Sequence, residues 1–134
     1  MPDQSQSSSG RARSRETPLV LLVDDDAMTR TMARHILEKH AFEVVEAAGG
    51  REALAKLRGG PFPDFLVTDL KMADGSGGWL VSQVGYEFPA LVARTVVITG
   101  AAAAHVAARW QCPVVAKPFT EADLLGAIES LKSK

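Results

Sequence analysis

Five short apolar runs, separated by segments with helical spacing, constrain the fold of this chain more than any other feature. The runs are Leu19 to Val23, Phe42 to Glu46, Asp64 to Thr68, Thr95 to Ile98 and Val114 to Ala116. Runs of this length that alternate with helices are typical of buried parallel strands joined by right-handed crossovers. The sequence therefore predicts an α/β domain with a doubly wound, five-stranded parallel sheet in the order 2-1-3-4-5.

The segments between and after these runs predict helices over residues 27–39, 50–58, 78–84, 101–109 and 120–131. In the first, Met28, Met32 and Ile36 recur at helical spacing behind Asp26, a candidate N-cap. Gly85 and the Pro89 region are expected to end the third helix. The fourth is nearly all alanine and has little to bury, and the last begins at Thr120 with the spacing of a capping box.

The composition predicts one compact domain without a nucleic-acid or membrane surface. The chain has 134 residues, and its formal charge of -1 leaves no excess of Lys and Arg for phosphate backbones or anionic lipids. Residues 1–17 are almost free of apolar side chains and are expected to be a disordered tail or linker before a folded domain at 18–134. The single cysteine, Cys112, and the absence of a signal-peptide core predict a cytoplasmic protein.

Polar groups suited to phosphate or metal chemistry stand where the runs end. Asp24 and Asp25 follow the first run, and Asp69, Thr99 and Lys117 follow the third, fourth and fifth. The carboxyl ends of parallel strands share one edge, so these groups are expected to converge there. Carboxylates gathered in this way repel one another by roughly 1 to 4 kcal/mol per pair at 4 Å, which favours a bound cation. Oxygen ligands with retained waters suit Mg²⁺.

A carboxylate beside Mg²⁺ can also attack phosphorus and form an acyl phosphate. Such a transfer needs positive charge and hydrogen-bond donors around the moving oxygens, and Lys117 and Thr99 can supply them. No pair of His or Cys residues has zinc spacing, and His35 and His40 are expected to be solvated or packed. The residues thus favour reversible phosphorylation of one aspartate.

Four motifs in this order resemble the receiver domain of two-component response regulators, a CheY-like, flavodoxin-like fold. They are Val23-Asp24-Asp25-Asp26, Asp69-Leu70-Lys71-Met72 followed by Gly77, Ile98-Thr99-Gly100 and Lys117-Pro118-Phe119. The resemblance extends over about residues 18–133. It implies a module that is phosphorylated by a sensor histidine kinase or a phosphotransfer protein and is not itself a conventional enzyme.

The resemblance also implies a role for each matching residue. Asp69 would be the phosphoacceptor and a Mg²⁺ ligand. Asp25 would bind the ion directly, Asp24 would hold it through water, and the main-chain oxygen of Lys71 would complete the protein ligands. Lys117 would pair with the phosphoryl group, and the Thr99 hydroxyl would turn inward to form a hydrogen bond with it. The Lys117–Pro118 peptide is commonly cis in the family. Asp26 is expected to be a surface or cap residue.

Two positions depart from the family pattern. Ala73 stands where the family usually has proline, and Val114 stands where it often has Tyr or Phe that swings inward as the Thr moves. Because Val114 has no aromatic ring, the coupled movement of threonine and ring that is usual in the family is in doubt here.

Three functions are to be compared with these sequence features. The first is the phosphoacceptor module, as a stand-alone regulator or the C-terminal receiver of a hybrid histidine kinase. The alternative is a pseudo-receiver, a binding module that keeps the fold and works without phosphorylation. A Mg²⁺-dependent phosphohydrolase would need a second acid two residues after Asp69, where this chain has Lys71, and a cap over its substrate.

Overall fold

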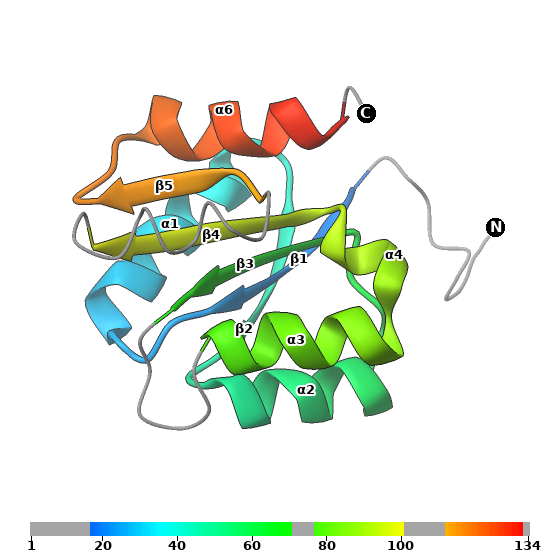
Figure 1. The fold of residues 1–134 in the computed structure, drawn as a ribbon. Coiled ribbons are helices and arrows are strands. Elements are labelled where there is room, and N and C mark those ends of the chain that lie inside the picture. Colours follow the sequence, from blue (N-terminus) through cyan, green and yellow to red (C-terminus); the bar gives the residue numbers. More distant parts are fainter. Residues whose placement is uncertain (1–16, 71–76, 101–111, 133–134) are drawn as a thin grey trace, which may run out of the picture.

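A single parallel sheet forms the centre of the molecule (Figure 1). The computed structural model describes residues 17–70, 77–100 and 112–132. The strands are β1 (Leu19–Val23), β2 (Glu43–Ala47), β3 (Phe65–Asp69), β4 (Thr95–Gly100) and β5 (Val114–Lys117). They are ordered β2-β1-β3-β4-β5, which confirms the predicted doubly wound topology with its switch point between β1 and β3.

Helices cover both faces of the sheet, as Figure 1 shows. The described helices are α1 (Ala27–Lys39), α2 (Gly50–Gly59), α3 (Gly77–Glu87), the short α4 (Pro89–Val92) and α6 (Glu121–Lys132). Helices α1 and α6 lie on one face, and α2 and α3 lie on the other. The predicted alanine-rich helix at 101–109 and the tail at 1–16 fall outside the described residues.

Two apolar clusters explain why the strands read as continuous apolar runs. Val20 and Leu22 point toward α1 and α6, whereas Leu21 and Val23 point toward α2 and α3. Every residue of β1 is buried. A strand with helices on both faces has no polar side, so the two-residue alternation of an exposed sheet is absent.

Helix α3 is longer than predicted, because it continues through Gly85 to Glu87. Gly85 lies on the exposed face, and the amide of Phe88 donates to the carbonyl of Val84 at 2.7 Å. Glycine inside a helix costs about 1 kcal/mol relative to alanine, and the burial of Leu80 and Val84 on the same helix outweighs that cost. The expectation that Gly85 ends the helix was wrong.

The N-terminal turn of α1 also differs from expectation. Asp26 occupies the N-cap position but makes no side-chain cap to the backbone, and its carboxylate accepts a hydrogen bond from the Thr29 hydroxyl instead. Met28 and Met32 are 81% and 44% exposed, while the buried residues of α1 are Ala33, Ile36 and Leu37. The methionines therefore form a solvent-facing stripe beside the core-facing one.

The last helix begins as predicted. The Thr120 amide donates to Asp123 Oδ2 at 2.9 Å, and the Asp123 amide donates to Thr120 Oγ1 at 3.0 Å, which is a reciprocal capping box. Across the described helices, none has both the length and the hydropathy needed to cross a membrane.

Candidate functional site

The candidate residues lie together at the carboxyl edge of the sheet. Asp69 and Lys117 are the last residues of β3 and β5, Thr99 is the penultimate residue of β4, and Asp24 directly follows β1. The ladder between neighbouring strands aligns Asp69 with Ile98 and Thr99 with Ala116. Because three of these residues belong to strands, backbone hydrogen bonds of the sheet set their positions.

Three carboxylates form an acidic cluster at the switch point. One carboxylate oxygen from each of Asp24, Asp25 and Asp69 lies within 4.8 Å of the others. Asp24 and Asp69 are 1% and 6% exposed, whereas Asp25 is open to solvent. The cluster is therefore buried on the sheet side and accessible from outside through Asp25.

Lys117 bridges two of these carboxylates. Its Nζ lies 2.8 Å from Asp69 Oδ2 and 2.9 Å from Asp24 Oδ2. Burial opposes the charged form of Lys117, but its contacts with Asp69 and Asp24 outweigh burial and raise the pKa of its ammonium. Burial raises the pKa of Asp24, although Lys117 and the Asp26 amide act in the opposite direction. One ammonium thus pairs with two of the three carboxyl groups of the cluster.

The carboxylates are oriented by backbone amides of the following loops. Asp24 Oδ1 accepts from the Asp26 amide at 2.9 Å, and Asp69 Oδ1 accepts from the Leu70 amide at 2.6 Å. These bonds leave the second oxygen of each carboxylate, Oδ2, directed toward Lys117.

Within residues 17–70, 77–100 and 112–132, two buried oxygen atoms at this edge have no well-formed hydrogen bond. They are Asp24 Oδ2, for which Lys117 is an ion-pair partner without hydrogen-bond geometry, and Thr99 Oγ1. A buried polar group without a hydrogen bond costs about 1 to 3 kcal/mol, so such atoms mark sites that bind something. Carboxylate oxygens are the donors that Mg²⁺ prefers, and the residues present fit that ion.

The structure thus brings together Asp24, Asp25, Asp69 and Lys117, and it buries Thr99 on the neighbouring strand at the same edge. The Lys117–Pro118 peptide bond is cis. Lys71, whose main-chain oxygen was predicted as a ligand, lies outside the described residues, and so does Ala73. Val114 is half-buried against Leu70, Val97 and Cys112, and Cys112 is itself buried.

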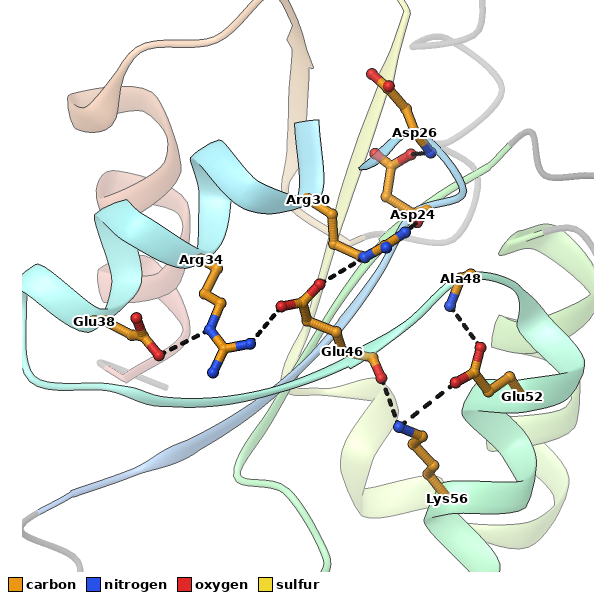
Figure 2. A network of polar contacts seen from close by, with 9 residues as sticks. All are labelled: Asp24, Asp26, Arg30, Arg34, Glu38, Glu46, Ala48, Glu52 and Lys56. Atoms are coloured by element: carbon orange, nitrogen blue, oxygen red, sulfur yellow. Dashed lines mark hydrogen bonds and ion pairs between the residues drawn. The ribbon is translucent and has the colours of Figure 1, made fainter. Parts of the chain in front are cut away.

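The sequence reasoning missed Arg30 and Glu46, which lie behind the acidic cluster (Figure 2). Arg30 donates through Nη1 to the main-chain oxygen of Asp24 and through Nε to Glu46 Oε1, both at 2.6 Å. The only sequence signal was an arginine in the first turn of a helix, where the helix dipole disfavours a cation.

The comparisons with known proteins agree with this geometry. The response regulator receiver domain family matches residues 20–129. A search of curated proteins finds no match. Among solved structures, the chain is similar to chemotaxis response regulator CheY4 of Vibrio cholerae, with 28% identity, a TM-score of 0.76, and coverage of 86% of this chain and 98% of that chain.

Two further solved structures are similar. One is a CheY-like response regulator receiver domain protein from Methanospirillum hungatei JF-1, with 27% identity, a TM-score of 0.75, and coverage of 87% of this chain and 95% of that chain. The other is the signal receiver domain of a signal transduction histidine kinase from Syntrophus aciditrophicus, with 22% identity, a TM-score of 0.75, and coverage of 87% and 91%, which supports the fold alone. This chain belongs to the response regulator receiver domain family.

Proposed function

We propose that this receiver domain is phosphorylated on Asp69, by a sensor histidine kinase or a phosphotransfer protein, in a reaction that requires Mg²⁺. The observation that carries the proposal is the position of Asp69, whose Oδ2 lies 2.8 Å from Lys117 Nζ inside a cluster of three carboxylates. The family to which the chain belongs acts in signalling rather than as conventional enzymes.

The chemistry follows from the groups at this edge. An Asp69 carboxylate oxygen attacks the phosphorus of the donor, the bond from phosphorus to the donor nitrogen or oxygen breaks, and the donor leaves with that electron pair. Lys117 stays beside Asp69 and offsets charge on the transferred oxygens. Asp25 and Asp69, with Asp24 through water and the main-chain oxygen of Lys71, would hold Mg²⁺, which when bound neutralises charge on the phosphoryl group.

Thr99 is the residue that would report the modification. Phosphorylation changes the charge at Asp69 from -1 to roughly -2 and adds new acceptor oxygens. The Thr99 hydroxyl is buried and has no hydrogen-bond partner among the described residues, so a phosphoryl oxygen would give its donor an acceptor. With Val114 in place of an aromatic ring, the response would rest on the movement of Thr99 itself.

The cellular context is a further part of the proposal. We place the domain in the cytoplasm, where histidine kinases present their phosphoryl groups and where the buried thiol of Cys112 stays reduced. The domain would act as a stand-alone regulator or as the C-terminal receiver of a hybrid histidine kinase.

The test is phosphate incorporation from acetyl phosphate and from a phosphorylated histidine kinase, followed by intact-mass spectrometry. Wild-type protein should gain one phosphoryl group with Mg²⁺, and Asp69→Asn should gain none because it lacks the nucleophile. Asp26→Asn is the matched control: it removes the same charge from an exposed neighbour of the cluster and should label like wild type.

Two results would contradict the proposal. Undiminished labelling of Asp69→Asn would mean that another group accepts the phosphate. A wild-type protein that takes no phosphate from either donor and does not respond to Mg²⁺ would instead be a pseudo-receiver, the alternative binding module.

A further inference from the structure

Arg30 occupies a position that the helix itself disfavours. It lies in the first turn of α1, where the partial positive charge of the helix dipole repels a cation, although Asp24, Asp25 and the N-cap residue Asp26 directly precede the helix. Residues that break a local rule are concentrated at sites where they serve another purpose. The contacts of Arg30 identify that purpose.

The guanidinium of Arg30 connects the acidic cluster to the edge strand β2, as Figure 2 shows. Its Nη1 donates to the main-chain oxygen of Asp24, and its Nε donates to Glu46 Oε1, each at 2.6 Å. The side chains of Arg30 and Glu46 are only 20% and 26% exposed. The planar guanidinium can make both bonds at once, which an ammonium group cannot do with the same geometry.

Glu46 is itself held from two sides. Its second carboxylate oxygen accepts from Arg34 Nη1 at 2.5 Å, and its main-chain oxygen accepts from Lys56 Nζ at 2.8 Å (Figure 2). The ladder between β1 and β2 pairs Glu46 with Leu22, so the strand register brings its carboxylate to the start of α1. Because these other contacts hold Glu46 in place, its carboxylate can hold the guanidinium of Arg30 in position.

The bond to Asp24 controls the backbone of the cluster. The carbonyl of Asp24 and the amide of Asp25 share one rigid peptide plane, so a partner that holds the carbonyl also sets where the Asp25 backbone points. The Asp24 amide is held by the Ala47 carbonyl at 3.1 Å, and the Arg30 bond supplies the second constraint. These two constraints come through β2 and α1, and they act together with the bond from the Asp26 amide to Asp24 Oδ1 within the loop.

We propose that Arg30, held by Glu46, is a positioning residue that fixes the Asp24–Asp25 peptide plane and so directs both carboxylates toward Mg²⁺. This inference rests on the proposed function, because it assumes that the acidic cluster binds Mg²⁺. Partners that orient the ligands of a metal typically change its affinity by about tenfold to a hundredfold when they are removed.

The experiment measures Mg²⁺ binding to the unphosphorylated full chain by titration calorimetry, with the free energy of unfolding measured in parallel. Arg30→Met should weaken Mg²⁺ binding by about tenfold. Arg30→Lys keeps the positive charge but lacks the planar guanidinium that makes both hydrogen bonds, so it should recover part of the lost Mg²⁺ affinity. In metal-free protein, the amide resonance of Asp25 should shift in Arg30→Met, because its peptide plane is released.

Arg34→Met is the matched control. It removes the other arginine partner of Glu46 one helical turn away but leaves the Asp24 carbonyl bonded. Its stability should fall, while its Mg²⁺ affinity should stay within about twofold of wild type, since the contact proposed to orient the ligands is intact. Glu46→Gln provides a second route if Arg30→Met does not fold: it loosens Arg30 without removing it and should weaken Mg²⁺ binding in the same direction.

Three outcomes overturn the inference, and they can be told apart. Unchanged Mg²⁺ affinity in Arg30→Met, or in Glu46→Gln if only that variant folds, removes the positioning role and leaves the proposed function intact. An equal loss in Arg34→Met would assign the effect to general destabilisation. A wild-type chain that binds no Mg²⁺ would contradict the proposed function, and the inference would fail with it.

Discussion

Thr99 and Thr95 lie on the same strand, and both are fully or almost fully buried, but their hydroxyl groups differ in one respect. Thr95 Oγ1 donates to the carbonyl of Leu91 at 2.8 Å, whereas Thr99 Oγ1 has no hydrogen-bond partner in the part of the chain that the structure describes. A buried hydroxyl without a partner destabilises the folded state, while a bonded one contributes to it. The two residues therefore make opposite predictions for the same substitution.

Thr99→Val should raise the free energy of unfolding by about 1 kcal/mol, because it replaces an unsatisfied hydroxyl with a methyl group of the same size. The same variant should still accept phosphate on Asp69 but lose the phosphate-dependent change in its amide spectrum. Thr95→Val should instead lower stability by about 1 kcal/mol, because it removes a buried hydrogen bond to the Leu91 carbonyl, which then keeps its bond from the Arg94 amide. Urea unfolding measures both, and a loss of stability in Thr99→Val would contradict the role assigned to its hydroxyl.

At the scale of elements, ion pairs between β2 and α1 connect the edge strand to the helix that follows β1. Glu46 accepts hydrogen bonds from both Arg34 and Arg30, and these hydrogen bonds hold the pKa of its carboxyl below the ordinary value. A carboxyl whose pKa is depressed by folding contributes stability above its unfolded pKa, and this contribution is lost as the pH falls through the folded pKa. The contribution of Glu46 should therefore be complete near neutral pH.

Glu46→Gln should lower the free energy of unfolding by about 1 kcal/mol near pH 7. The difference from wild type should shrink as the pH falls below the ordinary pKa of a glutamate, 4.5, because wild-type Glu46 then also becomes neutral. Glu38→Gln is the control, since Glu38 forms only an exposed pair with Arg34 and should change stability by about 0.3 to 0.5 kcal/mol. A Glu46→Gln difference that does not depend on pH would exclude the charge as its origin.

The five strands, their order and the helices α1, α2, α3 and α6 followed from the sequence because they depend on local patterns, whereas the short α4 was not predicted. Strand alternation with helices is enough to predict a parallel sheet, and parallel strands necessarily bring Asp24, Asp69 and Lys117 to one edge. The end of α3 was not predictable in this way, because whether Gly85 stops the helix depends on which face of the helix is buried. Arg30 and Glu46 were missed for a similar reason.

The contact between Arg30 and Glu46 depends on two facts that no local window contains. One is the register of β2 against β1, which places Glu46 opposite Leu22. The other is the path of the loop after β1, which turns the Asp24 carbonyl toward α1. The candidate ligands could be read from strand ends, whereas the groups that orient them appear only once the elements are packed together.

For the molecule as a whole, the acidic cluster carries an electrostatic cost that the fold has to offset. Asp24, Asp25 and Asp69 bring their carboxylates within 4.8 Å of one another, and Lys117 offsets only part of that charge. At such separations each pair of like charges costs roughly 1 to 4 kcal/mol, depending on the effective dielectric constant. The unfolded chain is free of this repulsion, so a cation that binds the cluster should favour the folded state.

Mg²⁺ should therefore stabilise the wild-type protein, by about 2.7 kcal/mol at a free concentration one hundred times its dissociation constant.

Asp25→Asn should differ from wild type both in its metal-free stability and in its response to Mg²⁺. Its metal-free form should be more stable than metal-free wild type, because one of three neighbouring carboxylates is neutral, and its response to Mg²⁺ should be strongly reduced, because a direct ligand is lost. Urea unfolding with increasing MgCl₂, against NaCl of equal ionic strength, separates binding from screening. An equal gain for Asp25→Asn and wild type, or the same gain in NaCl, would mean that the cluster responds to ionic strength and does not bind the ion.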